Sequence, residues 1–119
     1  MTPEEIQNQI IQEFEKFNDD LEKYNYLIKL GKELKPIDQK YKTDDYLIRG
    51  CQVDTWYHSE YINEKMIFYI DSVSLITKGF ISLLLRICQN QKPEDIKNTD
   101  FYFIDKIGLR GQFSPLKDN

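Results

Sequence analysis

The chain has 119 residues, of which 40% are hydrophobic, 30% are charged and 13% are aromatic. This length and balance predict a single globular domain over residues 1–119 and exclude a disordered chain. A formal net charge of −4 disfavours nucleic-acid binding, which needs clustered Lys and Arg, and no apolar stretch is long enough to span a bilayer. The N-terminus, MTPEEIQNQ, lacks the basic and apolar regions of a secretory signal, so we expect a cytoplasmic protein.

Two helices are expected in the first third of the chain. Thr2-Pro3-Glu4-Glu5 has the pattern of a capping box with proline at the first helical position. Asn18-Asp19-Asp20 predicts the start of a second helix, and Gly31 and Pro36 are expected to bracket its end. Spacings of three and four place the apolar residues on one face: Ile6, Ile10, Phe14, Phe17, Leu21, Tyr24, Leu27 and Leu30.

The middle of the chain predicts a β-hairpin. Residues 36–45 are polar and are predicted to form a loop that connects the second helix to the hairpin. Residues 52–58 are rich in β-branched and aromatic side chains, and residues 65–70 alternate between apolar and other side chains. We expect two antiparallel strands joined by a loop over residues 59–64, because too few residues separate them for a parallel crossover. Trp56 is expected to lie in the core.

A hydrophobic helix is predicted over residues 72–89, with Asp71-Ser72 as its N-cap. Its apolar residues cover more than a narrow stripe, so we expect it to be buried against the sheet. Gly79 within it favours close packing, because glycine there lowers helix propensity by about 1 kcal/mol. Shorter helices are expected from Pro93 and over residues 101–107. The predicted fold class is α+β, with a small antiparallel sheet flanked by helices.

Cys51 is the main candidate for chemistry. It follows Arg49 and Gly50, and glycine permits a tight, exposed turn. The thiolate is the reactive form of cysteine, and a cation close to a thiol favours it. Arg49 is a candidate for such a cation, unless alternation along a strand aims its side chain elsewhere. A lone Gly-Cys pair is more often structural than functional. Cys88 lies at the end of the hydrophobic helix and is interpreted as a small buried hydrophobe.

Other chemistries find little support in the residues. Zinc sites need three or four ligands with close pairs, whereas the two cysteines are far apart and His58 is the single histidine. A Cys–His hydrolase needs thiol and imidazole within hydrogen-bond reach. Cys51 and His58 are seven residues apart and would face opposite sides of one extended strand, so His58 is expected to be a surface residue near a strand end. The five glycines are scattered and form no phosphate-binding loop.

Four segments together are more specific than any single residue. They are LIKLGKEL at 27–34, IRGCQVDTW at 48–56, FYIDSVSLITKGFISLLL at 68–85 and LRGQFSPLKDN at 109–119. They resemble the segments LIxLGKxL, V-x-GCQSxVW, F-x-x-DSDAxIVKGLIALLL and LxxxLSPSRxN of the SufE family, in the same order and at about the same spacing. The resemblance covers nearly the whole chain.

The resemblance implies a SufE/IscU-like α+β domain and a sulfur carrier rather than a stand-alone enzyme. Cys51 matches the cysteine that accepts persulfide sulfur from a SufS-type cysteine desulfurase, which family members also stimulate. The sulfur then passes to iron–sulfur cluster assembly on a SufBCD-type scaffold. Pyridoxal phosphate belongs to the desulfurase, so the resemblance implies no cofactor in this chain, while the absence of a metal site is expected from the residues themselves.

The expected partner-binding or loop-supporting residues are Arg49, Gly50, Gln52, Asp71, Lys78 and Lys117. The chain departs from the family pattern at several positions, with Val53 for Ser, Val73 and Ser74 for Asp and Ala, Leu116 for Ser and Lys117 for Arg. Arg and Lys are not equivalent at forked contacts, so these departures bear on partner contacts rather than on the sulfur-accepting thiol.

Two other functions stay open at this point. One is an adaptor that binds a desulfurase without carrying sulfur, and the other is a CsdE-like relative that serves another sulfur acceptor, such as tRNA modification. A homodimer is compatible with the sequence, although nothing in the residues requires one. The end at Asn119 fits either a natural terminus or a truncation.

Overall fold

The structure is a computed structural model, and it describes residues 1–109. Five helices and one hairpin follow one another along this part of the chain, and an α+β fold is confirmed. The elements are α1 (Pro3–Glu15), α2 (Asp20–Glu33), the 3₁₀ turns η1 (Gln39–Tyr41) and η2 (Asp44–Tyr46), β1 (Thr55–Ile62), β2 (Lys65–Ser72), α3 (Leu75–Cys88), α4 (Pro93–Lys97) and α5 (Phe103–Lys106).

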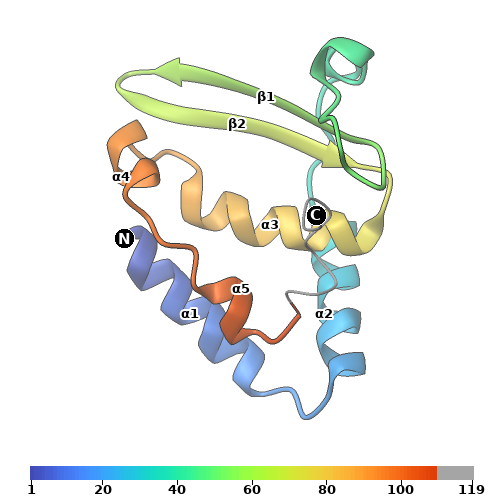
Figure 1. Ribbon diagram of the computed structural model, residues 1–119, viewed down its shortest axis with the longest axis vertical. Helices are drawn as coiled ribbons and strands as arrows, with labels where there is room; N and C mark the ends of the chain where they lie inside the picture. Colours follow the sequence, from blue (N-terminus) through green and yellow to red (C-terminus); the bar gives the residue numbers. More distant parts are fainter. Residues whose placement is uncertain (110–119) are drawn as a thin grey trace.

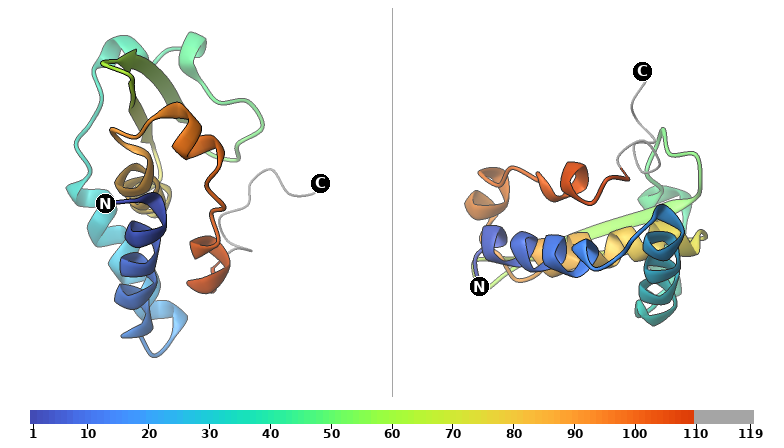
Figure 2. Two further views of the ribbon diagram at one scale, coloured as in Figure 1. Left: turned by 90° about the vertical axis from the view of Figure 1, so that its left-hand side faces the viewer. Right: turned by 90° about the horizontal axis from the view of Figure 1, so that it is seen from below.

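Helix α3 lies between the hairpin and the N-terminal helices (Figure 1). Strand β2 packs on one side of α3, while α1 and α2 contact α3 elsewhere and α5 packs on α1. Figure 2 shows the segment between α2 and β1 passing over the hairpin, where η1 and η2 contact β1. The expectation that the hydrophobic helix packs against the sheet is therefore confirmed.

The two N-terminal helices begin where local capping chemistry places them. Thr2 Oγ1 accepts the Glu5 amide at 3.1 Å, and Glu5 Oε1 accepts the Thr2 amide at 2.8 Å, which is a complete capping box. Asp19 caps α2 by accepting the Glu22 amide at 3.0 Å. Both helix starts were predicted from the sequence.

Helix α2 continues past Gly31 to Glu33 and so ends between Gly31 and Pro36, as expected. Gly31 and Gly79 lie where α2 and α3 cross. A Cβ added at Gly31 would lie 2.1 Å from the Leu75 carbonyl oxygen, and one added at Gly79 would lie 2.1 Å from that of Leu27. Both glycines therefore permit close backbone approach, as expected for Gly79.

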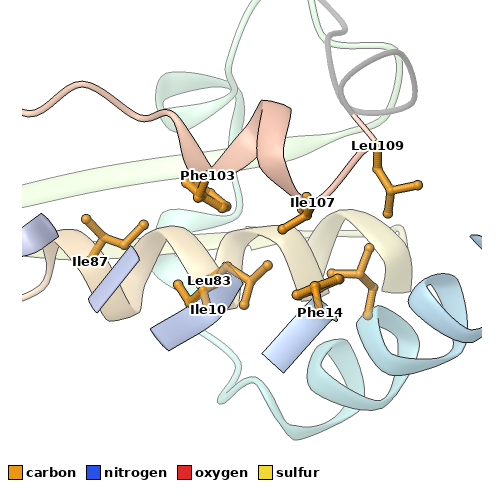
Figure 3. Close-up of a cluster of buried hydrophobic side chains, with 8 residues drawn as sticks. Ile10, Phe14, Leu83, Ile87, Phe103, Ile107 and Leu109 are labelled. Atoms are coloured by element: carbon orange, nitrogen blue, oxygen red, sulfur yellow. The ribbon is translucent and has the colours of Figure 1, made fainter. Parts of the chain in front are cut away.

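The core lies where α1, α3 and α5 meet, and Figure 3 shows its side chains converging there. Its buried members are Ile10, Phe14, Leu27, Leu83, Ile87, Phe103, Ile107 and Leu109. One polar side chain, Gln7, is fully buried beside them. Its amide donates to the Asp100 carbonyl at 3.0 Å and accepts the Phe103 amide at 3.1 Å, so it ties the C-terminal segment to α1 without an unpaired polar group.

The hairpin is longer than the sequence indicated. Strand β1 runs to Ile62, and the predicted loop over residues 59–64 shrinks to a two-residue turn at Asn63 and Glu64, with φ of 53° and 68°. Positive φ at both turn residues suits the right-handed twist of a hairpin. The first strand begins at Thr55, so Cys51 lies outside it. Trp56 is half-buried and does not belong to the buried core, contrary to expectation.

Helix α3 begins later than expected. Ser74 is its N-cap and accepts the Thr77 amide at 3.3 Å, whereas Asp71 and Ser72 belong to β2. The prediction of an Asp71-Ser72 cap is therefore wrong, because the strand extends through both residues. Short helices at α4 and α5 match the predictions for the C-terminal third. Within residues 1–109, no helix combines the length and apolar character needed to cross a membrane.

Candidate functional site

Cys51 lies in the loop that connects η2 to β1. Gly50 has φ of 84°, a left-handed conformation that favours glycine, so the residue before the thiol makes a sharp turn. The Cys51 side chain is half-buried and its thiol is free, while Arg49 and Gln52 are exposed on either side. The loop therefore presents its thiol at the surface without exposing it fully.

Backbone hydrogen bonds tie both ends of this loop to the hairpin. The Ile48 amide donates to the Thr55 carbonyl at 2.8 Å, which closes the loop on itself. The Val73 amide donates to the Asp54 carbonyl at 3.1 Å, which joins the exit of the loop to the end of β2. No such bond involves Arg49, Gly50 or Cys51 among the described residues, so the tip is held through its two ends.

Two buried hydroxyl groups reinforce the base of the loop. Ser72 Oγ donates to the Asp54 carbonyl at 3.0 Å. Thr55 Oγ1 lies 3.1 Å from Ser72 Oγ and 3.2 Å from the Val53 carbonyl, and it can donate to either. Both side chains are only 5% exposed, so water competes little for these bonds. Thr55 and Ser72 pair directly across the two strands and lock the loop exit to β2.

A buried carboxylate lies next to this base. Asp71 is 1% exposed, and Lys42 Nζ and Lys78 Nζ lie 3.1 Å and 3.5 Å from its two oxygens. Burial alone would raise the pKa of Asp71, but the Ser72 amide, which donates to Oδ1 at 2.8 Å, and the two ammonium groups together lower it. The carboxylate is therefore charged at neutral pH and joins three segments of the chain.

The second thiol lies at the opposite end of α3. Cys88 is half-buried at the edge of the core, and burial raises its pKa. Helix α3 spans 14 residues, so its Cys88 end is about 20 Å from the end where Val73 holds the Cys51 loop. The distance excludes a disulfide within the chain, and the burial keeps Cys88 protonated and weakly nucleophilic.

Comparison with known proteins then identifies the family. The family model "SufE: Fe-S metabolism associated domain" matches residues 8–119. This chain belongs to the SufE family. It is 38% identical over 96 residues to the "Cysteine desulfuration protein SufE" of Wigglesworthia glossinidia brevipalpis, with 79% of this chain and 67% of that protein covered.

Two further comparisons agree. The "Sulfur acceptor protein CsdE" of Escherichia coli is 30% identical over 95 residues, which cover 78% of this chain and 65% of that protein. A solved structure of a hypothetical protein from Thermus thermophilus superposes with a TM-score of 0.72 at 20% identity, covering 98% of this chain and 85% of the other. This last likeness shows a shared fold.

The structure brings some of the family-derived site residues together and separates others. Asp71 and Lys78 are in direct contact beside the loop base, whereas Arg49 and Gln52 lie on the exposed tip. Lys117 and Leu116 lie outside the described residues. Two apolar departures from the family pattern, Val53 and Val73, are 36% and 64% exposed and therefore face solvent near the loop.

His58 is engaged elsewhere. Its ring stacks on Tyr41 with centroids 4.5 Å apart, and its Nε2 lies 3.1 Å from Glu60 Oε2. His58 lies in the middle of β1 and is half-buried, so the expectation of a surface residue near a strand end is wrong.

The sequence analysis did not identify Lys42, which pairs with Asp71 and lies over the Trp56 ring. No sequence pattern marks a functional lysine in a polar connection.

Proposed function

We propose that this chain accepts sulfur on Cys51 from a SufS-type, pyridoxal-phosphate-dependent cysteine desulfurase. The observation that carries the proposal is the placement of Cys51, on a loop whose base is tied to the hairpin while its tip is exposed. Membership in the SufE family and the names of two relatives, a cysteine desulfuration protein and a sulfur acceptor protein, support it. The proposed role is that of a sulfur carrier rather than a stand-alone enzyme.

The transfer is a thiol exchange that needs no external oxidant or reductant. The Cys51 thiolate attacks the terminal sulfur of a persulfide on the desulfurase cysteine. A new sulfur–sulfur bond forms on Cys51, the bond between the terminal sulfur and the desulfurase cysteine breaks, and that cysteine leaves as a thiolate. One thiol on this chain suffices. The chemistry of releasing sulfur from free cysteine belongs to the cofactor of the desulfurase.

The arrangement of the loop suits insertion into a partner. Arg49 and Gln52 flank the thiol and are free to contact a desulfurase, while the bonds of Thr55 and Ser72 keep the base in place. We further propose that docking stimulates the desulfurase by removing its persulfide, and that the sulfur passes from Cys51 to iron–sulfur cluster assembly on a SufBCD-type scaffold.

Mass spectrometry of the intact chain tests the proposal. Incubation with a SufS-type desulfurase and cysteine is expected to add one sulfur atom to the wild type and to Cys88→Ala. Cys51→Ala is expected to gain none. A wild-type chain without added sulfur on Cys51, in a reaction where the desulfurase itself turns over, would refute sulfur acceptance.

The same variant separates a carrier from an adaptor. If Cys51 carries sulfur, Cys51→Ala binds the desulfurase but fails to raise the rate at which it releases alanine from cysteine. An adaptor that only reshapes the desulfurase would stimulate equally with either residue at position 51. Fluorescence anisotropy of labelled Cys51→Ala measures whether it still binds the desulfurase. If it binds but does not stimulate, the loss of stimulation is assigned to the missing thiol.

A further inference from the structure

The Asp71 carboxylate connects the two ends of the Cys51 loop. Its Oδ2 lies 3.1 Å from Nζ of Lys42, which precedes the loop in the chain. Its Oδ1 accepts the Ser72 amide at 2.8 Å, and the Ser72 hydroxyl donates to the Asp54 carbonyl at 3.0 Å. Asp54 follows Cys51, so one side of the carboxylate holds the segment that enters the loop and the other side holds the residue at which the chain leaves it.

Lys42 is held in place by its backbone and by its side chain. Its amide closes the η1 turn with a hydrogen bond of 2.9 Å. The neighbouring Tyr41 stacks on the ring of His58 in β1 with centroids 4.5 Å apart, which anchors this turn on the hairpin. The Lys42 ammonium also lies 5.7 Å from the centre of the Trp56 ring, within the range of a cation–π contact. Its direction toward Asp71 is therefore fixed before any partner binds.

The second lysine on Asp71 has a different role. Lys78 Nζ lies 3.5 Å from Oδ1 and belongs to α3, so this pair joins β2 to the helix and not to the loop. Asp71 Oδ2 is buried, and within residues 1–109 no backbone amide or hydroxyl donates to it. The Lys42 ammonium is therefore what offsets the burial of that oxygen. Without it, a buried charge is left uncompensated on the side that faces the loop entrance.

We propose that Lys42 is a positioning residue for sulfur transfer, because its ion pair with Asp71 holds the Cys51 loop in the arrangement from which the thiol receives sulfur. The inference rests on the proposed function, since it gives Lys42 a part in that same step. At the loop entrance, the Ile48 amide bond belongs to the backbone, whereas the Lys42 ion pair depends on a side chain. This second contact can be removed by a single substitution.

The position of the thiol depends on these supports more than on its own contacts. Among the described residues, no backbone hydrogen bond outside the regular elements involves Arg49, Gly50 or Cys51, so the place of the thiol is set by the two ends of the loop. Attack on a persulfide requires the incoming sulfur to be aligned with the bond that breaks, and a misplacement of about 1 Å can slow a reaction roughly 100-fold. Loosening the entrance is therefore expected to slow transfer even when the partner still binds.

The substitution Lys42→Met tests this role. Methionine removes the ammonium and keeps an unbranched stem over the Trp56 ring. In single-turnover reactions with a persulfide-loaded SufS-type desulfurase, the rate of sulfur gain on Cys51 at saturating desulfurase is expected to fall about tenfold. The half-saturating concentration is expected to change less than about twofold, because the exposed tip is intact. Lys42→Arg restores the cation and is expected to restore most of the rate.

Lys40→Met is the matched control. Lys40 lies in the same segment, with its Nζ 5.1 Å from the centre of the Tyr41 ring, and it forms no ion pair within residues 1–109. This variant is expected to transfer sulfur at the wild-type rate. A residue that served stability alone would lower Tm on substitution but leave the saturated rate unchanged at a temperature where every variant is folded. An unchanged rate for Lys42→Met, or an equal loss in Lys40→Met, would overturn the inference.

Alkylation of the thiol tests the same ion pair without a desulfurase. In a Cys88→Ala background, Cys51 is the single remaining cysteine. Iodoacetamide is expected to label it about threefold faster in Lys42→Met, because a looser entrance exposes a half-buried thiol more often. Lys42→Arg and Lys40→Met are expected to react at the rate of the parent. An unchanged labelling rate in Lys42→Met would show that the ion pair does not hold the loop.

The two hypotheses fail in different ways. A wild-type chain that gains no sulfur would refute the proposed function and, with it, the part of Lys42 in transfer. Sulfur gain at equal rates by the wild type and by Lys42→Met would refute the role of Lys42 and leave Cys51 as the acceptor.

Discussion

Gly79→Ala is expected to weaken the fold by forcing α2 and α3 apart. A Cβ at position 79 would lie 2.1 Å from the Leu27 carbonyl oxygen and 2.9 Å from its Cα, whereas ordinary contacts begin at 3.4 Å. The obstructing atoms are backbone, so no side chain can rotate away. The helices must separate, and the neighbouring crossing point at Gly31 must open with them.

Two effects of this substitution oppose each other. Alanine raises helix propensity by about 1 kcal/mol over glycine. Overpacking a well-packed contact costs about 1–3 kcal/mol and more when backbone must move. Because the overlap exceeds 1 Å and involves backbone, we place the cost at the upper end, so that the free energy of unfolding falls by about 2 kcal/mol net and Tm by roughly 8 °C.

Urea and thermal unfolding, followed by circular dichroism, measure the effect. Gly31→Ala is expected to behave similarly, because its Cβ would lie 2.1 Å from the Leu75 carbonyl oxygen. Asn25→Ala, an exposed site on α2, supplies the control and is expected to raise stability by about 0.5 kcal/mol through propensity alone. Stability of Gly79→Ala equal to or above the wild type would refute the packing argument.

Three further outcomes are expected. Asp71→Asn is expected to lower the free energy of unfolding by about 2 kcal/mol at neutral pH. Because the pKa of Asp71 is lowered in the folded chain, the difference in stability from the wild type is expected to shrink as pH falls below about 4. Urea titrations at several pH values measure this difference. Burial and the Glu13 carboxylate raise the pKa of Tyr26 to about 12, so Tyr26→Phe removes the last tyrosinate absorbance transition, and an unchanged titration would contradict this. Iodoacetamide labels Cys51 at least tenfold faster than Cys88 at neutral pH, as peptide mass spectrometry would show; comparable rates would contradict the effect of burial on Cys88.

The starts of the helices were predictable from local sequence, because capping depends on neighbouring residues. The crossing of α2 and α3 was not predictable in this way. The capping box at Thr2 and the N-cap at Asp19 depend on residues within one turn, so the sequence indicates them directly. Gly31 and Pro36 were interpreted as bracketing a helix end, and α2 does end between them, at Glu33. The role of Gly31 at the helix crossing depends on Leu75, far away in the chain, and no local pattern carries that information.

The full length of the hairpin was likewise not predictable from local sequence patterns. Residues 59–64 contain Ser, Glu, Asn and Glu, which suggested a loop, but pairing with β2 extends the strand to Ile62. Among the residues around the site, Cys51 and Gly50 were identifiable from the family segments and from the conformational freedom of glycine. The contact of Lys42 with Asp71 was not identifiable from the sequence. It joins a polar connection to the end of a strand, and these two segments lie side by side only in the folded chain.

The bonds around the Cys51 loop divide its residues into two groups with different consequences. Ile48, Asp54 and Thr55 hold the base through hydrogen bonds to the hairpin, and the Asp71 carboxylate joins β2 to α3 and to the segment before the loop. Changes there alter stability and loop position together. The tip residues, Arg49 to Val53, contribute one backbone carbonyl to this network, and all of them except the half-buried Cys51 are exposed. Substitutions at Arg49 or Gln52 are therefore expected to change docking and sulfur transfer while leaving unfolding unchanged, so side chains at the tip can change partner preference without disturbing the support of the thiol.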